Sequence, residues 1–176
     1  VLFVVGNNWR SDYLRYATGV QVIEGHAVGI VARDGAIQVL LESPVETARV
    51  AAEWPDIEVS WSESSVAQAE RVIASMAGKN IGLAPRPALP FKLATGAAGG
   101  TVAKASAMME RVMLVKTPAE LEACRRSAQL ADDGYQVFLK GARPGRPEYA
   151  LVADVEAYYR SQGCAENFQI LGSGGV

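Results

Sequence analysis

Residues 117–163 carry the strongest local signals in the chain, because they mark two successive helices with defined ends. Thr117, Pro118 and Glu120 form a helix start: the threonine can accept a first-turn N–H, the proline's missing N–H costs nothing there, and the glutamate is placed as in a capping box. Gly141 and Pro144 predict the end of this helix. Spacings of three and four predict one stripe of apolar or small residues along it: Leu121, Cys124, Ala128, Ala131, Tyr135 and Phe138.

A second helix and a strand are predicted to follow. The helix begins near Pro147 and Glu148 and ends at Gly163, and residues 168–171 are typical of a strand that enters a Gly-Ser-Gly-Gly turn. The apolar face of the second helix is formed by Leu151, Val152, Val155, Tyr158 and Tyr159. The unit is therefore helix, short connection, helix and strand. We expect its apolar stripes to lack most of the sheet that they would normally cover.

The first part of the chain alternates strands with helices, which predicts an α/β layer built on a mixed sheet. A hairpin is expected around Arg33, Asp34 and Gly35. Residues 85–100 contain several prolines and glycines and are expected to be irregular. We place the domain boundary near Met109, giving domains 1–109 and 110–176. Strands are predicted at residues 1–5, 27–32, 36–41, 57–61 and 79–83, and helices at 9–16, 45–54 and 65–76.

Composition and charge narrow the class of protein. The formal net charge of −2 argues against a nucleic-acid or anionic membrane surface as partner. No apolar run approaches the ~20 residues that a membrane span needs, and no signal peptide is expected at the start. Cys124 and Cys164 are expected to be reduced thiols, which favours a cytoplasmic protein. The chain lacks an initiator Met and stops inside a turn, so we expect it to be part of a longer protein.

Three sequence phrases in the last third resemble one known family. They are V-K-T-P-A-E-L-E with R-R-S-A, then K-G-A-R-P-G-R-P-E-Y-A-L, then F-Q-I-L-G-S-G-G, and their order and spacing resemble the opening of the catalytic domain in the creatinase, prolidase and aminopeptidase P family. The phrases G-N-N, Y-L, A-T-G and the D-G hairpin are similar to its amino-terminal domain. The resemblance implies an α/β creatinase-type amino-terminal domain with a mixed sheet. The first helix-helix-strand unit of a pita-bread (α+β) catalytic domain would follow it.

The resemblance also implies metal chemistry outside this chain. In the family, two divalent ions (Mn, Co or Zn) are held by two Asp, one His and two Glu, and a bridging water attacks a C–N bond. These ligands follow the Ser-Gly turn, so we expect no metal, no cofactor and no activity in this segment alone. The residues agree: the single histidine, His26, is far upstream. Asp132 and Asp133 are adjacent on a helix, point about 100° apart and are expected on a solvated face.

The resemblance implies that some residues of this chain contact the substrate. Glu24 and His26 lie in a segment that can reach the active site of a neighbouring subunit in creatinase-like relatives, which implies a homodimer. Trp9 could form an aromatic wall beside Arg10, and Phe168 and Ser173 mark the strand and turn of the second part. The alternative is that Glu24 and His26 are surface loop residues and that Trp9 packs against the domain edge.

Two functions remain open for the parent protein. The first is a cytoplasmic, homodimeric hydrolase, similar to Xaa-Pro dipeptidases, that cleaves an Xaa-Pro peptide bond or a C–N bond of a small amino-acid-like compound. The second is a catalytically inactive pita-bread relative that binds a ligand or peptide. Two departures from the family pattern bear on this choice: Val176 stands where the turn usually carries Asn, and Pro147 replaces the usual Thr. The presence or loss of the downstream metal ligands would decide between the two.

Overall fold

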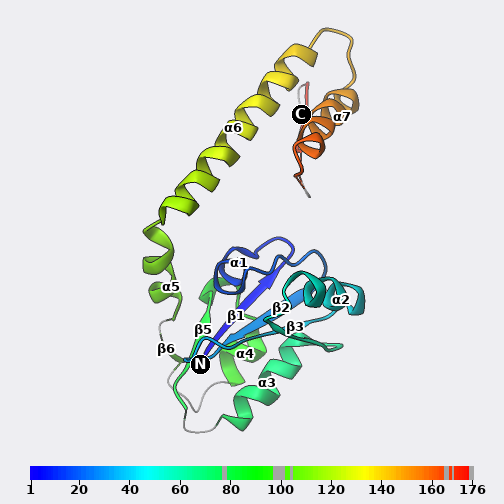
Figure 1. The fold of residues 1–176 in the computed structure, drawn as a ribbon. Coiled ribbons are helices and arrows are strands. Elements are labelled where there is room, and N and C mark those ends of the chain that lie inside the picture. The colour runs from blue at the N-terminus through cyan, green and yellow to red at the C-terminus, as the bar shows by residue number, and fades with distance from the viewer. Residues whose placement is uncertain (77–78, 97–101, 104, 165–166, 168, 175–176) are drawn as a thin grey trace. The chain divides into compact units, whose positions relative to one another are not determined.

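The computed structural model describes residues 1–76, 79–96, 102–103, 105–164, 167 and 169–174. They form two compact units, Val1–Val115 and Lys116–Val176 (Figure 1). Met109, the boundary predicted from the sequence, therefore falls inside the first unit. It lies in helix α5 (Ala105–Leu114) and is buried in a small cluster with Ala84 and Ala105. This packing against the end of a strand keeps the helix in the first unit.

The first unit is built on a mixed sheet of six strands in the order β4-β3-β2-β1-β5-β6. Neighbouring pairs β1–β2 and β2–β3 are antiparallel, whereas β1–β5, β3–β4 and β5–β6 are parallel. The predicted mixed sheet is thus confirmed, and all six strands belong to the first unit. Their bounds are β1 Leu2–Asn7, β2 His26–Val31, β3 Ile37–Leu41, β4 Glu58–Trp61, β5 Ile81–Ala84 and β6 Val102–Ala103.

Helices cover both faces of this sheet (Figure 1). Alternate residues of each strand point to opposite faces, and both faces carry apolar side chains that pack against helices. On one face Phe3 and Val5 pack in a core with Ala69 of α3 and Leu93 of α4. On the other face Val4 packs with residues of α1 and α2. The bounds are α1 Asp12–Thr18, α2 Pro44–Glu53, α3 Ser65–Ser75, α4 Phe91–Gly96, and a short 3-10 helix at Arg86–Ala88. The result is a three-layer α/β unit.

Two of the first unit's helices begin at serine caps. Ser43 Oγ accepts a hydrogen bond from Glu46 N at 3.4 Å, and Ser64 Oγ accepts one from Ala67 N at 3.2 Å. The expected irregular conformation of residues 85–100 is wrong in part, because residues 91–96 form α4. Leu93 is fully buried in the sheet core, and this burial favours a helix where local composition predicted none. Residues 97–100 lie outside the described part.

The second unit contains two long helices, α6 (Pro118–Gly141) and α7 (Glu148–Ser161). The predicted capping box is confirmed: Thr117 Oγ1 accepts from Glu120 N at 3.2 Å, and Glu120 Oε2 accepts from Thr117 N at 2.7 Å. The connection turns at Gly145, whose φ is +82°, and an ion pair of 2.6 Å joins Arg146 to Asp154. The two helices therefore form a locally stabilised helical hairpin.

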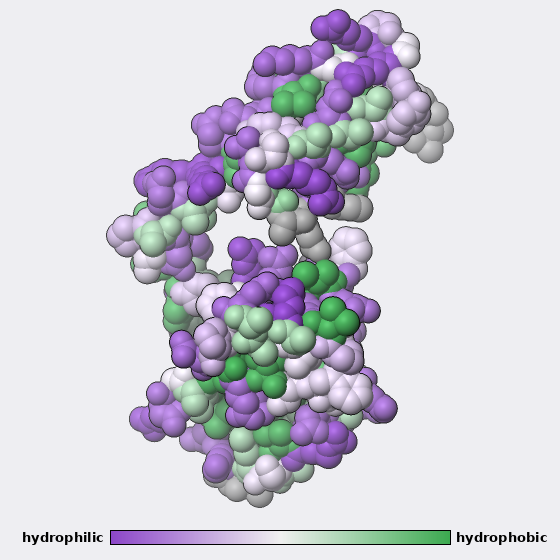
Figure 2. Space-filling model, turned by 45° about the vertical axis from the view of Figure 1, so that its right-hand side comes forward, coloured by the Kyte–Doolittle hydropathy of each residue, from purple (hydrophilic) through white to green (hydrophobic). Residues whose placement is uncertain are grey.

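The facing sides of α6 and α7 enclose a hollow of about 320 Å³ lined mainly by the predicted apolar stripes. Tyr135 and Phe138 stack with ring centroids 6.1 Å apart, yet Tyr135 remains 58% exposed. Figure 2 shows hydrophobic residues set among hydrophilic ones on the visible face of the molecule. The stripe residues that line the hollow include Ala131, Tyr135, Phe138, Leu151, Val155 and Tyr159.

The strand expected in the second unit is wrong, and the solvated face expected for Asp132 and Asp133 holds only for Asp132, which is exposed. Residues 169–171 do not form a strand: no described strand of this unit lies beside them to pair with, and Ile170 is 88% exposed. Asp133 does not simply face solvent. Its carboxylate accepts hydrogen bonds from Gln129 Nε2 at 3.0 Å and from the Tyr158 hydroxyl at 3.2 Å. The helical register turns this carboxylate toward α7.

The start of α6 is predicted to loosen in acid. Hydrogen bonds with Thr117 hold the pKa of Glu120 below its ordinary value of 4.5. The largest contribution comes from the backbone N–H of Thr117, and a smaller one comes from its side chain. Because the folded-state pKa is the lower one, the stabilisation is complete above pH 4.5 and is lost as the pH falls through the lowered pKa. Amide exchange at Thr117, followed from about pH 5 to about pH 3 after correction for intrinsic exchange, should show this loss. Glu120→Gln should remove the pH dependence, and an unchanged profile would contradict the assignment.

Candidate functional site

The carboxyl ends of most strands lie at one edge of the sheet. Strands β1, β3, β4 and β5 run in the same direction and end there, whereas β2 begins there. Trp9 and Arg10 follow β1 at this edge, and Glu24 and His26 lie at the start of β2. Asn7 and His26 are direct cross-strand partners. The structure therefore brings four of the six predicted site residues to one edge, where ligands commonly bind in open α/β sheets.

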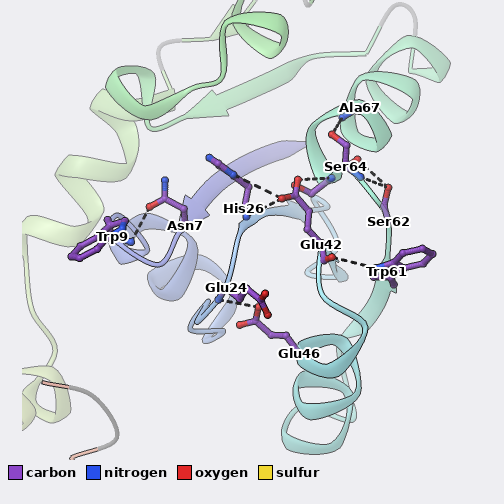
Figure 3. Close-up of polar contacts among 11 residues, drawn as sticks. Asn7, Trp9, Glu24, His26, Glu42, Glu46, Trp61, Ser62, Ser64 and Ala67 are labelled. Carbon is purple, nitrogen blue, oxygen red and sulfur yellow. Dashed lines mark hydrogen bonds and ion pairs between the residues drawn. The ribbon is translucent and has the colours of Figure 1, made fainter.

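The turn that carries Trp9 and Arg10 is held by Asn7, through its side chain and through two backbone hydrogen bonds with Arg10. Asn7 Oδ1 accepts a hydrogen bond from the backbone N–H of Trp9 at 2.9 Å (Figure 3). It also accepts one from the backbone N–H of Arg10 at 2.9 Å. Trp9 is 74% exposed. It borders an open hollow of about 560 Å³ that Arg10, Arg15 and Pro85 also line. An aromatic face and two guanidinium groups thus border one depression.

His26 lies beside the carboxylate of Glu42, the residue that follows β3. Glu42 Oε2 accepts a hydrogen bond from His26 N at 3.1 Å and lies 3.9 Å from His26 Nδ1 (Figure 3). Its other oxygen, Oε1, accepts from Ser65 N at 3.0 Å and from Ser65 Oγ at 2.9 Å. The His26 side chain is 55% exposed. The imidazole is therefore accessible while its backbone is held.

Glu24 lies in a segment that a second carboxylate holds. Glu46 of α2 has a side chain only 4% exposed, and it accepts hydrogen bonds from Ile23 N at 2.6 Å and from Glu24 N at 3.4 Å. Arg49 donates to Glu46 Oε1 at 3.2 Å and to the carbonyl of Gln21 at 2.9 Å. The buried charge is thus paired and hydrogen-bonded, as burial requires. The Glu24 side chain itself is exposed.

Sequence reasoning missed Glu42 and Glu46. Residues 43–46 have the Ser-x-x-Glu pattern, which normally indicates a capping box in which the glutamate bonds back to its own helix start. Here the Glu46 side chain bonds to residues 23 and 24 instead. Only the tertiary fold places that segment within reach. For Glu42, no local pattern indicated its role.

The two remaining candidates belong to the second unit. The Ser173 hydroxyl donates a hydrogen bond to Glu148 Oε1. Glu148 thus lies in the first turn of α7, as predicted, and also contacts the turn after residue 171. Phe168 lies outside the described residues.

The described donors do not form a metal centre. No three His, Cys, Asp or Glu side chains among the described residues are grouped so as to hold an ion. The carboxylates of Glu42 and Glu46 already accept backbone N–H groups, so these two do not present free oxygens to a cation. The described residues therefore would not by themselves hold the two metal ions, whose ligands the resemblance places after the Ser-Gly turn. Within the described parts of the chain, no helix combines the length and apolar character that crossing a membrane requires.

Sequence comparisons identify one curated relative. No protein-family model matches the chain. An uncharacterized peptidase, YqhT, of Bacillus subtilis (strain 168) is 30% identical over 69 residues, which cover 39% of this chain and 20% of that protein. The likeness thus concerns a minor part of that peptidase.

Comparison with solved structures defines the class of fold. The Xaa-Pro dipeptidase from Bacillus anthracis matches 92% of this chain with a TM-score of 0.61 and 15% identity. The prolidase from Pyrococcus horikoshii OT3 matches 92% with a TM-score of 0.63 and 14% identity, and that from Pyrococcus furiosus matches 91% with 0.61 and 16%. The chain has an α/β fold with a mixed sheet, followed by a helix pair. This fold is shared with prolidase and aminopeptidase P structures, as the sequence resemblance predicted. The chain spans 44% of each of the three structures described.

Proposed function

We propose that this chain is the amino-terminal domain and the opening helices of a metal-dependent hydrolase of the prolidase and aminopeptidase P kind. The complete protein would cleave an Xaa-Pro peptide bond or a C–N bond of a small amino-acid-like compound. The observation that carries this proposal is the fold match over 92% of the chain to an Xaa-Pro dipeptidase. The partial sequence match to a curated peptidase supports it.

Two divalent metal ions (Mn, Co or Zn) would be held by residues that follow this chain, as the family resemblance implies. No group of three His, Cys, Asp or Glu side chains among the described residues is arranged to hold an ion. Such ions activate water and stabilise the charge that develops on the substrate. The present residues would instead contribute substrate contacts, and the edge that carries Trp9, Arg10, Glu24 and His26 is the best candidate surface for them.

We further propose a homodimer in which this edge serves the partner's catalytic domain, with the segment of Glu24 and His26 near the partner subunit's Ser173. The exposure of Trp9 and His26 supports a role in contacting a small molecule or dipeptide. Cys124 and Cys164 are both free thiols, which is consistent with a cytoplasmic protein.

The activity is tested on the complete protein with a series of Xaa-Pro dipeptides. We expect turnover that a chelator abolishes and that added Mn²⁺, Co²⁺ or Zn²⁺ restores. Absence of turnover under all three metals, together with retained dipeptide binding in calorimetry, would favour the inactive binding relative instead. Absence of both turnover and binding would contradict the proposal.

His26 is tested by substitution in the same complete protein. We expect His26→Ala to lower kcat/KM for an Xaa-Pro dipeptide by about tenfold, since one lost hydrogen bond of ~1.4 kcal/mol corresponds to that factor. Its thermal unfolding midpoint should change little, because the side chain is 55% exposed. Arg33→Ala, an exposed substitution in the β2–β3 turn, is the matched control and should leave kcat/KM unchanged. Equal kcat/KM values for both variants would show that His26 is a surface residue.

A further inference from the structure

A single carboxylate joins three elements at the sheet edge. Glu42 follows β3, accepts the backbone N–H of His26 at the start of β2, and accepts both the N–H and the hydroxyl of Ser65 at the start of α3. Its main chain contributes as well, because the carbonyl of Glu42 accepts from Trp61 Nε1 at 3.3 Å (Figure 3). Each carboxylate oxygen has at least one donor, so the orientation of the group is defined.

The backbone beside His26 is shaped to fit this carboxylate. Gly25 has a φ of +70°, a left-handed conformation that side chains other than glycine rarely adopt. An added Cβ at Gly25 would lie 3.2 Å from Glu42 Oε2. The chain thus turns sharply in front of the carboxylate and then enters β2 at His26. This conformation brings His26 Nδ1 to 3.9 Å from the same oxygen that holds its N–H.

We propose that Glu42 is a positioning residue, which holds the segment of Gly25 and His26 so that the exposed imidazole points from the sheet edge in one orientation. The part of this proposal that concerns turnover rests on the proposed function. The anchoring itself does not depend on that function. Charge-assisted hydrogen bonds from backbone N–H groups are stronger than neutral ones, so a glutamate suits this task better than an uncharged acceptor. Ser65 is fully buried and fixes the far side of the carboxylate.

The anchoring is tested by hydrogen exchange on the complete protein. In Glu42→Ala we expect amide exchange in the peptide covering residues 20–26 to rise about tenfold. Glu42→Gln keeps the shape and one acceptor, and it should give a smaller rise. Glu58→Ala is the matched control, because the Glu58 carboxylate accepts a side-chain hydrogen bond from Gln38 on the neighbouring strand. Unchanged exchange in both Glu42 variants would overturn the proposal.

The link to His26 is tested by a double-mutant cycle on kcat/KM with an Xaa-Pro dipeptide. We expect Glu42→Ala to lower kcat/KM severalfold in the wild-type background and to have no further effect in the His26→Ala background. If Glu42 only stabilises the fold, Glu42→Ala would leave kcat/KM of the folded protein unchanged. If Glu42 and His26 act independently, the effects of the two substitutions on kcat/KM would add. Either result would overturn the positioning role. If His26→Ala alone does not affect turnover, the proposed role of His26 fails. The exchange experiment then still decides whether Glu42 anchors the segment.

Discussion

Replacing Gly6 or Gly29 with valine is expected to lower the free energy of unfolding of the first unit by about 2 kcal/mol or more. Both glycines lie where helix α1 rests directly on strands β1 and β2. An added Cβ at Gly6 would lie 2.9 Å from Leu14 Cβ, and one at Gly29 would lie 2.8 Å from Thr18 Cγ2 and 2.9 Å from Leu14 Cδ1. Leu14 is fully buried and Thr18 nearly so, so neither side chain can move aside into solvent.

The physical balance favours a large effect. Valine is a better strand former than glycine, which offsets up to ~1 kcal/mol of the cost. Leu14 Cβ, however, is attached to the helix backbone, so the Gly6 substitution must displace α1 itself. Urea unfolding of each variant, with Ala36→Val as a control at an exposed position, measures the difference. A change for Gly6→Val no larger than that for Ala36→Val would show that α1 moves freely on the sheet.

Replacing Glu46 with alanine is expected to destabilise the first unit by about 3 kcal/mol. The substitution leaves the N–H groups of Ile23 and Glu24 without their acceptor in a partly buried site. It also removes one of the two carboxylates that pair with Arg49. Unmet hydrogen-bond donors that are shielded from water carry their full desolvation cost.

Glu53→Ala is the matched control for Glu46. Glu53 pairs with the same arginine at 2.6 Å, but its side chain is 50% exposed, against 4% for Glu46. Exposed ion pairs contribute little, so we expect a loss of about 0.5 kcal/mol or less from Glu53→Ala. Thermal or urea unfolding of both variants makes the comparison. Similar losses in the two variants would mean that the arginine pairing, and not the backbone bonds of residues 23 and 24, accounts for the effect.

Several elements were predictable because their sequence signals are local. The capping box of Thr117 and Glu120 predicted the start of α6, and serines cap α2 and α3 close to the predicted starts of those helices. Asp34 and Gly35 predicted the hairpin, in which Val31 pairs with Ile37. These features depend on hydrogen bonds and dihedral angles within a few residues, so the same few residues suffice to predict them.

Local sequence signals did not show which distant segments meet. Strand β1 lies between β2 and β5, and this order brings Trp9, Arg10, Glu24 and His26 to one edge. The family resemblance had suggested these candidates, but no local pattern placed them together. Nor did a local pattern indicate that Glu42 accepts the N–H of His26 and that Glu46 accepts the N–H of Glu24. Conversely, residues 169–171 have the composition of a strand, yet the described structure provides no neighbouring strand. Strand pairing and buried charge depend on partners far along the chain, which local sequence patterns do not specify.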